Sequence, residues 1–186
     1  MTVNSENARI YGSDLDSIYL APIGTVLPDD ISTALGVEFE DVGWLHSDGI
    51  AETQTGSVEK IRGHQGNGVV RTRMNEPGTT VSFTALETKA QTQSLRYDEK
   101  IVTSAAGVRT ATRGAGQKVS ARVAVIEVFD ADNEEIKERI VIPRFEITPN
   151  GDRAMVNSDI AGFPFVGEII GDYFAYTTDL EEPALP

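Results

Sequence analysis

The sequence of 186 residues contains no cysteine, which excludes disulfide bonds and metal sites built on thiolates. Histidine is almost as scarce: only His46 and His64 occur, so carboxylates would have to supply most ligands of any zinc site. No stretch approaches the roughly 18 apolar residues of a membrane-spanning helix, and the acidic, polar N-terminus lacks a signal-peptide pattern. We therefore expect a protein that is made and kept in a cytosol, without membrane contact, and stabilised by packing or oligomerisation.

Basic residues are few, with 16 lysines and arginines against 29 acidic residues and a net charge of -13. This balance argues against sequence-specific DNA binding, which needs cations to displace counterions from phosphates. The charge is unevenly distributed: residues 1–56 carry -9, residues 57–128 carry +5 and residues 129–186 carry -9. Two interpretations stay open, namely scatter over solvated surfaces, or a self-complementary surface in which the basic middle of one copy meets the acidic flanks of another.

Motifs for catalysis or cofactor binding are also missing. The consecutive residues His46-Ser47-Asp48 cannot fold back into a nucleophile, base and orienting acid, so a turn is the better interpretation. Residues 130–134 open like a calcium loop, but Glu135 stands where the sharp turn needs glycine, and Val141 where a bidentate glutamate belongs. We expect no enzyme activity, no metal and no cofactor.

The remaining pattern is typical of a mainly β protein. Hydrophobic residues make up 40% and charged residues 24%, which suits one globular domain over residues 1–186. Alternating or continuous apolar runs predict strands over residues 37–45, 57–62, 69–74, 79–86, 119–129, 136–147 and 163–177. In the strand 79–86, Val81, Phe83 and Ala85 lie on one face. In the segment 163–177, Gly167 and Gly171 are expected to be bends. The run 119–129 is apolar on both faces and predicts a central strand. Pro143 indicates an edge position or a bulge in the next strand.

One helix is predicted over residues 87–98, where Thr88 and Gln91 fit a capping box. Residues 1–19 are expected to form an N-terminal arm and residues 178–186 an acidic C-terminal tail. The segment 105–116 is longer and more basic than a plain strand connection needs, and the pattern assigns it no role.

Residues 50–78 predict a long, polar hairpin. We expect Asp48 and Gly49 to turn the chain before it, and Gly63, Gly66 and Gly68 to form its flexible tip. An isolated two-stranded ribbon is only marginally stable in water, so this hairpin needs a neighbour.

Four cations alternate with other residues on the two hairpin strands. Lys60 and Arg62 would share one face of their strand, and Arg71 and Arg73 one face of theirs. These residues are candidates for contacts between subunits, and a merely solvated ribbon face is the alternative.

The chain resembles the major tail tube protein of bacteriophages with long, non-contractile tails, in particular siphophages of actinobacterial hosts. The resemblance covers residues 10–177, and three segments show it best: 21–28, 43–50 and 81–87. This resemblance implies a β-sandwich or barrel-like core with one flanking helix and extended terminal arms. It implies hexameric rings that stack into a tube, with the hairpin 50–78 bridging rings and DNA passing through the lumen without tight binding.

The resemblance further implies a structural virion protein, made in the host bacterial cytoplasm, whose partners are itself, the tape measure protein and the tail terminator or tip proteins. Two other classes stay open. A capsid decoration protein or another tail structural protein would share the composition. An immunoglobulin-like adhesion or carbohydrate-binding module would expose aromatic residues, whereas Trp44 stands in a strand that we expect to be buried.

Overall fold

The computed structural model describes residues 8–179 and confirms a mainly β protein with one short helix. The outermost parts of the expected arms, residues 1–7 and 180–186, lie outside the described residues. The elements in chain order are β1 (Ser17–Ala21), β2 (Glu40–Asp41), β3 (Leu45–Arg62), β4 (Val69–Ala85), α1 (Ala90–Arg96), β5 (Glu99–Ala105), β6 (Val108–Arg113), β7 (Ser120–Phe129), β8 (Lys137–Pro149), β9 (Phe163–Ile169) and β10 (Phe174–Thr177).

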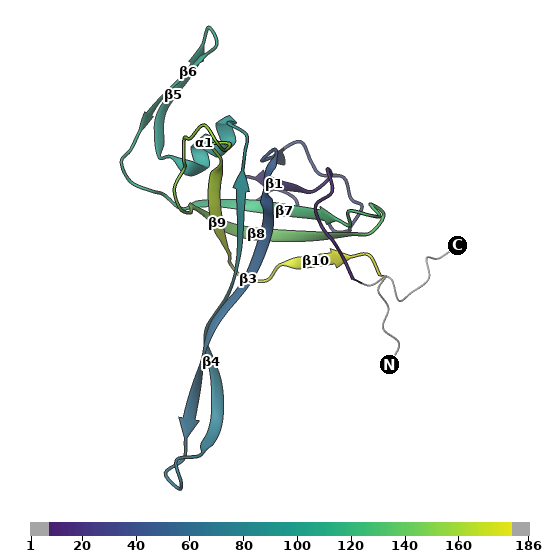
Figure 1. Cartoon of the computed structure of the whole chain (residues 1–186), viewed down its shortest axis with the longest axis vertical. Helices are drawn as coiled ribbons and strands as arrows, with labels where there is room; N and C mark the ends of the chain where they lie inside the picture. Colours follow the sequence, from purple (N-terminus) through teal and green to yellow (C-terminus); the bar gives the residue numbers. More distant parts are fainter. Residues whose placement is uncertain (1–7, 180–186) are drawn as a thin grey trace, which may run out of the picture.

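The main sheet is antiparallel throughout and runs in the order β2-β1-β7-β8-β9-β4-β3. Strand β10 pairs with β8 next to β9, so that β9 and β10 follow each other along one edge of β8. The β3–β4 end of the sheet crosses over β7 and β8 (Figure 1), which encloses the core in the manner of a sandwich. Strands β5 and β6 form a separate two-stranded sheet.

The core lies between these two parts of the bent sheet, and Leu95 of α1 joins it. Strand β4 presents the three buried residues that its alternation predicts: Val81, Phe83 and Ala85. Strand β7 is central and buried on both faces, as its sequence predicts, because Ile126 belongs to the core cluster while Val125 is buried on the other face.

A buried arginine attaches the loop over residues 22–39 to β8. Arg139 is paired with Glu127 of β7, and its guanidinium also donates to the carbonyl oxygens of Asp30 at 2.8 Å and Thr33 at 2.7 Å. Because the loop is held there by its backbone, its apolar side chains can remain exposed, as Val26 (87%) and Val37 (99%) are.

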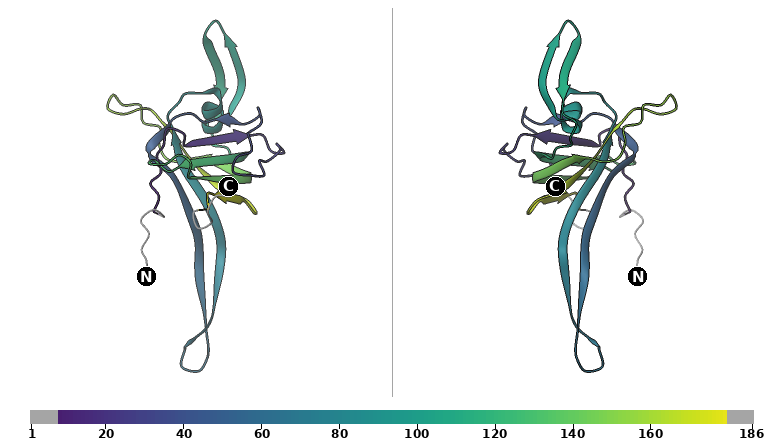
Figure 2. Two further views of the ribbon diagram at one scale, coloured as in Figure 1. Left: turned by 90° about the vertical axis from the view of Figure 1, so that its right-hand side faces the viewer. Right: turned by 90° about the vertical axis from the view of Figure 1, so that its left-hand side faces the viewer.

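Two ribbons leave the body in opposite directions (Figures 1 and 2). The longer is made by β3 and β4, and the shorter by β5 and β6. The segment 105–116, unassigned from sequence, supplies the turn and the second strand of the shorter ribbon, and Ala106 and Gly107 of the turn lie in the left-handed region. Its basic character is explained by Arg109 and Arg113, which pair with Glu99 on the facing strand.

The expected turn at Asp48 and Gly49 is wrong. Both residues lie within the continuous strand β3, where the pairing steps from Leu45↔Ala85 to Ile50↔Phe83. The additional β3 residues form a bulge, and Gly49 takes up the left-handed backbone conformation with φ of 71°. An Asp-Gly pair serves a bulge as well as a hairpin turn, since both need a residue with positive φ.

The strand expected over residues 37–45 is reduced to the two residues of β2. Gly43 interrupts it with φ of 87°, and the Gly43 N–H donates to the Asp41 carboxylate at 2.9 Å instead of to a sheet partner. Trp44 follows this break and is 69% exposed, which corrects the expectation that it is buried.

The helix is shorter than the expected 87–98, and its cap lies one residue later than Thr88. The Lys89 N–H donates to Thr92 Oγ1 at 3.0 Å, and that hydroxyl donates to the Glu87 carbonyl at 2.9 Å. The fully buried Thr92, and not Gln91, therefore provides the side-chain acceptor for the Lys89 N–H, which has no backbone acceptor within the helix.

Three further sequence expectations meet the structure. Residues 17–19 of the expected arm belong to β1, and Tyr11 forms an isolated bridge with Asp130. The described part of the arm is therefore attached to the sheet at these two places. Pro143 lies at an irregularity in the β7–β8 register, which confirms the bulge. Gly171 does bend the chain after β9, but Gly167 is paired within β9.

Candidate functional site

The part of the β3–β4 hairpin beyond the sheet, residues 54–62 and 69–79, is called the ribbon below. Strand β9 pairs with β4 only from Thr80 to Ala85, so among the described residues no third strand accompanies the ribbon. Its side chains are almost all exposed, and its two outer edges present backbone N–H and C=O groups without strand partners. Such edges are templates for pairing with another chain.

The tip of the ribbon is a tight loop. The Gly63 N–H donates to the Gly68 carbonyl at 2.9 Å, and the Arg62 guanidinium donates to the Asn67 carbonyl at 2.9 Å. Gly66 (φ 67°) and Asn67 (φ 54°) adopt left-handed backbone conformations. The three predicted tip glycines are therefore together at the end of the ribbon, and Arg62 is partly engaged there.

The four cations lie on the ribbon in two pairs, on opposite faces. Strand register places Val58 opposite Met74 and Lys60 opposite Thr72, and side chains that face each other across two strands share one face. The first face thus contains these residues together with Arg62: Val58, Lys60, Arg62, Thr72 and Met74. The second face contains the residues between them: Ser57, Glu59, Ile61, Arg71, Arg73 and Asn75.

The two faces differ in charge. Along the stretch from Val58 to Arg62 and from Thr72 to Met74 the first face has no acidic residue, and its apolar members Val58 and Met74 are 56% and 55% exposed. On the second face Glu59 lies opposite Arg73 and accepts a hydrogen bond from Asn75 at 3.1 Å. This stretch of the first face is therefore apolar and basic, whereas the second face is partly neutralised within the chain.

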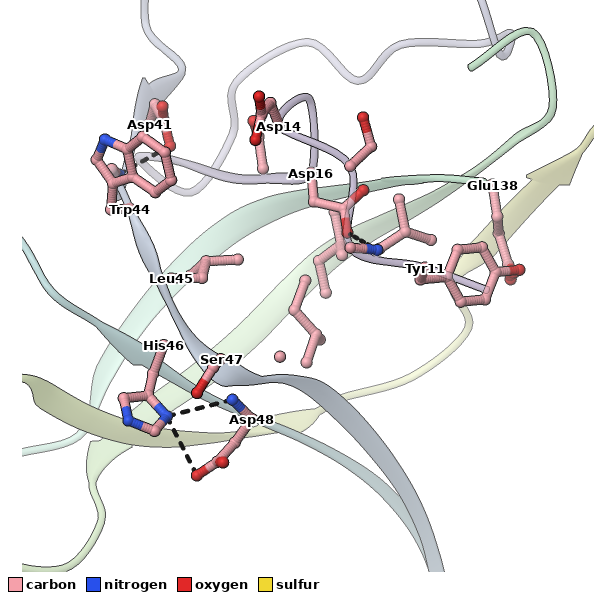
Figure 3. A pocket seen from close by; sticks show the side chains of 18 of the residues that line it. Tyr11, Asp14, Asp16, Asp41, Trp44, Leu45, His46, Ser47, Asp48 and Glu138 are labelled. Atoms are coloured by element: carbon pink, nitrogen blue, oxygen red, sulfur yellow. Dashed lines mark hydrogen bonds and ion pairs between the residues drawn. The ribbon is translucent and has the colours of Figure 1, made fainter. Parts of the chain in front are cut away.

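A groove of about 780 Å³ lies where β3 leaves the body, and we name it the Trp44 groove. The side chains labelled in Figure 3 come from the N-terminal segment, β2 and the connection that follows it, β3 and β8. Apolar side chains of the sheet, among them Ile50, Ile126 and Ile140, line it together with Tyr11 and Trp44. Seven acidic residues line it as well: Asp14, Asp16, Asp41, Asp48, Glu52, Glu87 and Glu138.

No lysine or arginine is among the residues that line the Trp44 groove in the described part of the chain. Most of its carboxylates accept hydrogen bonds from neutral groups, such as Glu138 from the Tyr11 hydroxyl at 3.3 Å and Glu52 from the Tyr173 hydroxyl at 3.0 Å. Glu87 accepts from the Trp44 N–H at 3.0 Å and lies 3.4 Å from Lys89 Nζ. Negative charge in the groove is therefore only partly balanced.

The local environments shift several ionisations in the groove. Burial raises the pKa of Asp16 above its ordinary value, although hydrogen bonds from Phe129 N–H and Gly12 N–H oppose this. The hydrogen bond from Trp44 N–H holds the pKa of Glu87 below its usual value, helped by Lys89. Burial raises the pKa of Tyr11 above its ordinary value, helped by Glu138.

His46, Ser47 and Asp48 line the groove without forming a nucleophile relay. His46 Nδ1 accepts a hydrogen bond from the Asp48 N–H at 3.2 Å and lies 3.2 Å from the Asp48 carboxylate, but Ser47 makes no hydrogen bond to either residue (Figure 3). Among residues 8–179 there is no group of acidic and histidine side chains placed to hold a metal ion. The same range contains no helix long and apolar enough to cross a membrane.

The shorter ribbon is fixed to α1 by an ion-pair cluster. Glu99, whose side chain is 2% exposed, accepts from Arg109 at 2.6 Å and from Arg113 at 3.4 Å. Both arginines also donate to the Gln93 amide oxygen of α1, and Arg113 lies 3.7 Å from the centre of the Tyr97 ring. Local sequence could not reveal the cluster, because its members come from three elements.

The described residues present open strand edges, apolar side chains outside the core, and surface regions of opposite charge. Sequence reasoning located the ribbon and its cations but missed the Trp44 groove, whose acids come from distant segments. The charge of -9 over residues 1–56 was the only signal for this groove.

A search among curated proteins gave no match. The family model described as phage tail tube protein matches residues 1–172. The chain therefore belongs to the phage tail tube protein family, as a structural protein of the virion tail.

Proposed function

We propose that six copies of this chain close into a ring and that the rings stack into a tube that conducts DNA from the virion into the host. The phage would have a long, non-contractile tail and infect an actinobacterial host. The chain would have no catalytic activity. Family membership supports the general role, and the features of the ribbon support self-assembly in particular.

The observation that carries the proposal is the ribbon itself. Two strands without a covering layer are marginally stable in water, because neither face nor edge is protected. Here Val58, Ile61 and Met74 are each about half exposed on such a ribbon. A neighbouring copy would cover these side chains, and strand addition along the open edges would satisfy the backbone groups.

Closure into a ring is supported by the position of β3 at one end of the sheet order. An edge strand of one copy can continue the sheet into the next, and full closure removes the exposed edges. The ribbon, residues 50–78 in the sequence expectation, would then reach the adjacent ring. We propose the four cations Lys60, Arg62, Arg71 and Arg73 as contacts between subunits.

The other proposed partners follow from the role of a tube. The tape measure protein would occupy the lumen before DNA, and the terminator and tip proteins would cover the two ends. The terminal segments 1–19 and 178–186 would add contacts between subunits. A net charge of -13 per copy supports a wall that does not retain DNA, since tight binding requires cations facing the phosphates.

Exposure of Trp44 removes one reason against a carbohydrate-binding module, because this aromatic side chain is available at the surface. Family membership favours the tube instead. In the tube, an exposed Trp44 would be a contact for another subunit, as aromatic residues commonly are in interfaces.

Sedimentation velocity of the purified full chain tests the proposal. We expect species at six times the subunit mass of 20.1 kDa and longer stacks of that unit. A monomer that persists at high protein concentration would contradict self-assembly, and a stable trimer would favour a decoration protein.

A further inference from the structure

We propose that the Trp44 groove of one copy binds the first face of the ribbon of another copy. This pairing rests on the proposed self-assembly and assigns the receiving site for the ribbon. The two surfaces match in both charge and polarity, although they lie on separate parts of the chain.

The groove contributes acids around apolar residues. Asp14 has no hydrogen-bond or ion-pair partner among the described residues, and Glu52 and Glu138 are engaged only by tyrosine hydroxyls. Among the described residues none of these three carboxylates is paired with a lysine or arginine. In the same groove Trp44 is 69% exposed and Ile50 is partly buried, which leaves apolar surface for an incoming side chain.

The ribbon supplies the complementary features on its first face. Lys60 and Arg62 bring two positive charges with no carboxylate beside them on that face. Val58 and Met74 lie next to these cations and expose more than half of their surface. Methionine adapts readily to aromatic partners, so Met74 against Trp44 would be a favourable contact.

The second face fits the groove less well. It contains Glu59, which would place a carboxylate against the acids of the groove, and like charges brought together oppose association. Arg71 and Arg73 on that face remain free for a different neighbour. The charge pattern therefore selects one of the two faces.

The pairing must join different copies. At about 3.3 Å per residue, the path along β3 from Glu52, the groove residue nearest the ribbon, to Val58 spans roughly 20 Å. Met74 pairs with Val58, so its side chain lies equally far from the groove of its own chain. The ribbon also points away from the body in every view (Figures 1 and 2).

Thiol cross-linking tests the pairing cleanly, because the natural sequence has no cysteine. One variant carries Ser47→Cys in the groove and a second carries Met74→Cys on the first face. The control variant carries Ile61→Cys, which is 46% exposed on the second face and lies three residues along β3 from Val58, the strand partner of Met74. Ser47 variants are mixed with each ribbon variant before assembly, treated with a short bismaleimide, and the linked peptides are identified by mass spectrometry.

We expect efficient linkage of position 47 to position 74 and at least tenfold less linkage of position 47 to position 61. Electron microscopy of the same samples reports whether tubes or rings have formed. Assembled particles with no 47–74 linkage, or with equal linkage to both positions, would overturn the pairing while leaving the proposed function intact. Failure of the unsubstituted chain to assemble would instead contradict the proposed function, and the pairing with it.

Discussion

Close packing at single residues sets limits on substitution, and Gly167 is the sharpest case. A Cβ atom at this position would lie 2.1 Å from Cζ of the Phe145 ring, which is fully buried. Glycine is needed in β9 because the aromatic ring occupies the space of its side chain. The sequence indicated a special role for Gly167, but the reason for the glycine is Phe145 on the neighbouring strand β8.

We predict that Gly167→Ala lowers the free energy of unfolding by about 1–3 kcal/mol, the usual cost of overpacking a core. Gly116→Ala is the matched control, since a Cβ there meets nothing within 4 Å and its backbone has no positive φ. Urea unfolding of the dissociated subunits measures both. Equal stability of the two variants would show that the Phe145 ring can move aside.

Glu99 makes the attachment of the shorter ribbon sensitive to acid. The Arg109 hydrogen bond holds the pKa of this carboxyl below its ordinary value of 4.5, and Arg113 adds to the effect. A group with a lowered folded pKa contributes stability above its unfolded pKa and loses that contribution as the pH falls through the folded pKa. The cluster should therefore be intact at neutral pH and weaken in acid.

We predict that Glu99→Gln is less stable than the natural chain at pH 7 and that this difference closes as the pH falls below about 4.5. Thermal unfolding of both proteins across this pH range gives the comparison. Because other carboxylates titrate in both proteins, only the difference between them is interpreted. A difference that stays constant down to pH 3 would contradict the role assigned to the ionised carboxylate.

At the scale of elements, the sequence predicted those features that depend on the residues of one strand alone, such as which side chains are buried. Alternation placed Val81, Phe83 and Ala85 correctly, and continuous apolarity identified β7 as central. Features that depend on distant partners could not be predicted. The bulge at Asp48 and Gly49 exists because β3 continues its pairing with Phe83 and Ala85. The Trp44 groove brings together acids from segments as far apart as Asp14 and Glu138.

The ribbon should be the least protected element of the free subunit. We predict fast amide hydrogen exchange over residues 54–62 and 69–79 in the monomer, because within residues 8–179 no third strand or apolar layer covers them. Assembly should slow that exchange strongly, while β7 stays protected in both states. Equal exchange of the ribbon before and after assembly would mean that no neighbour covers it.

For the whole molecule, net charge determines how an assembled tube treats DNA. Each copy contributes -13, so we predict that purified tubes fail to retain duplex DNA even at low salt, where any basic groove would bind most strongly. Filter binding at low ionic strength measures this. Tight, salt-sensitive retention would place the basic residues of 57–128 along a DNA path and contradict a non-binding wall.

Electron microscopy of the purified full chain tests the central claim, self-assembly into a tube, most directly. The account predicts tubes built from stacked sixfold rings with an open lumen. A variant that shortens the ribbon by deleting residues 57–74 should keep the body folded and lose the stacks. Particles that remain single subunits at high protein concentration, or close with another symmetry and no lumen, would contradict the account.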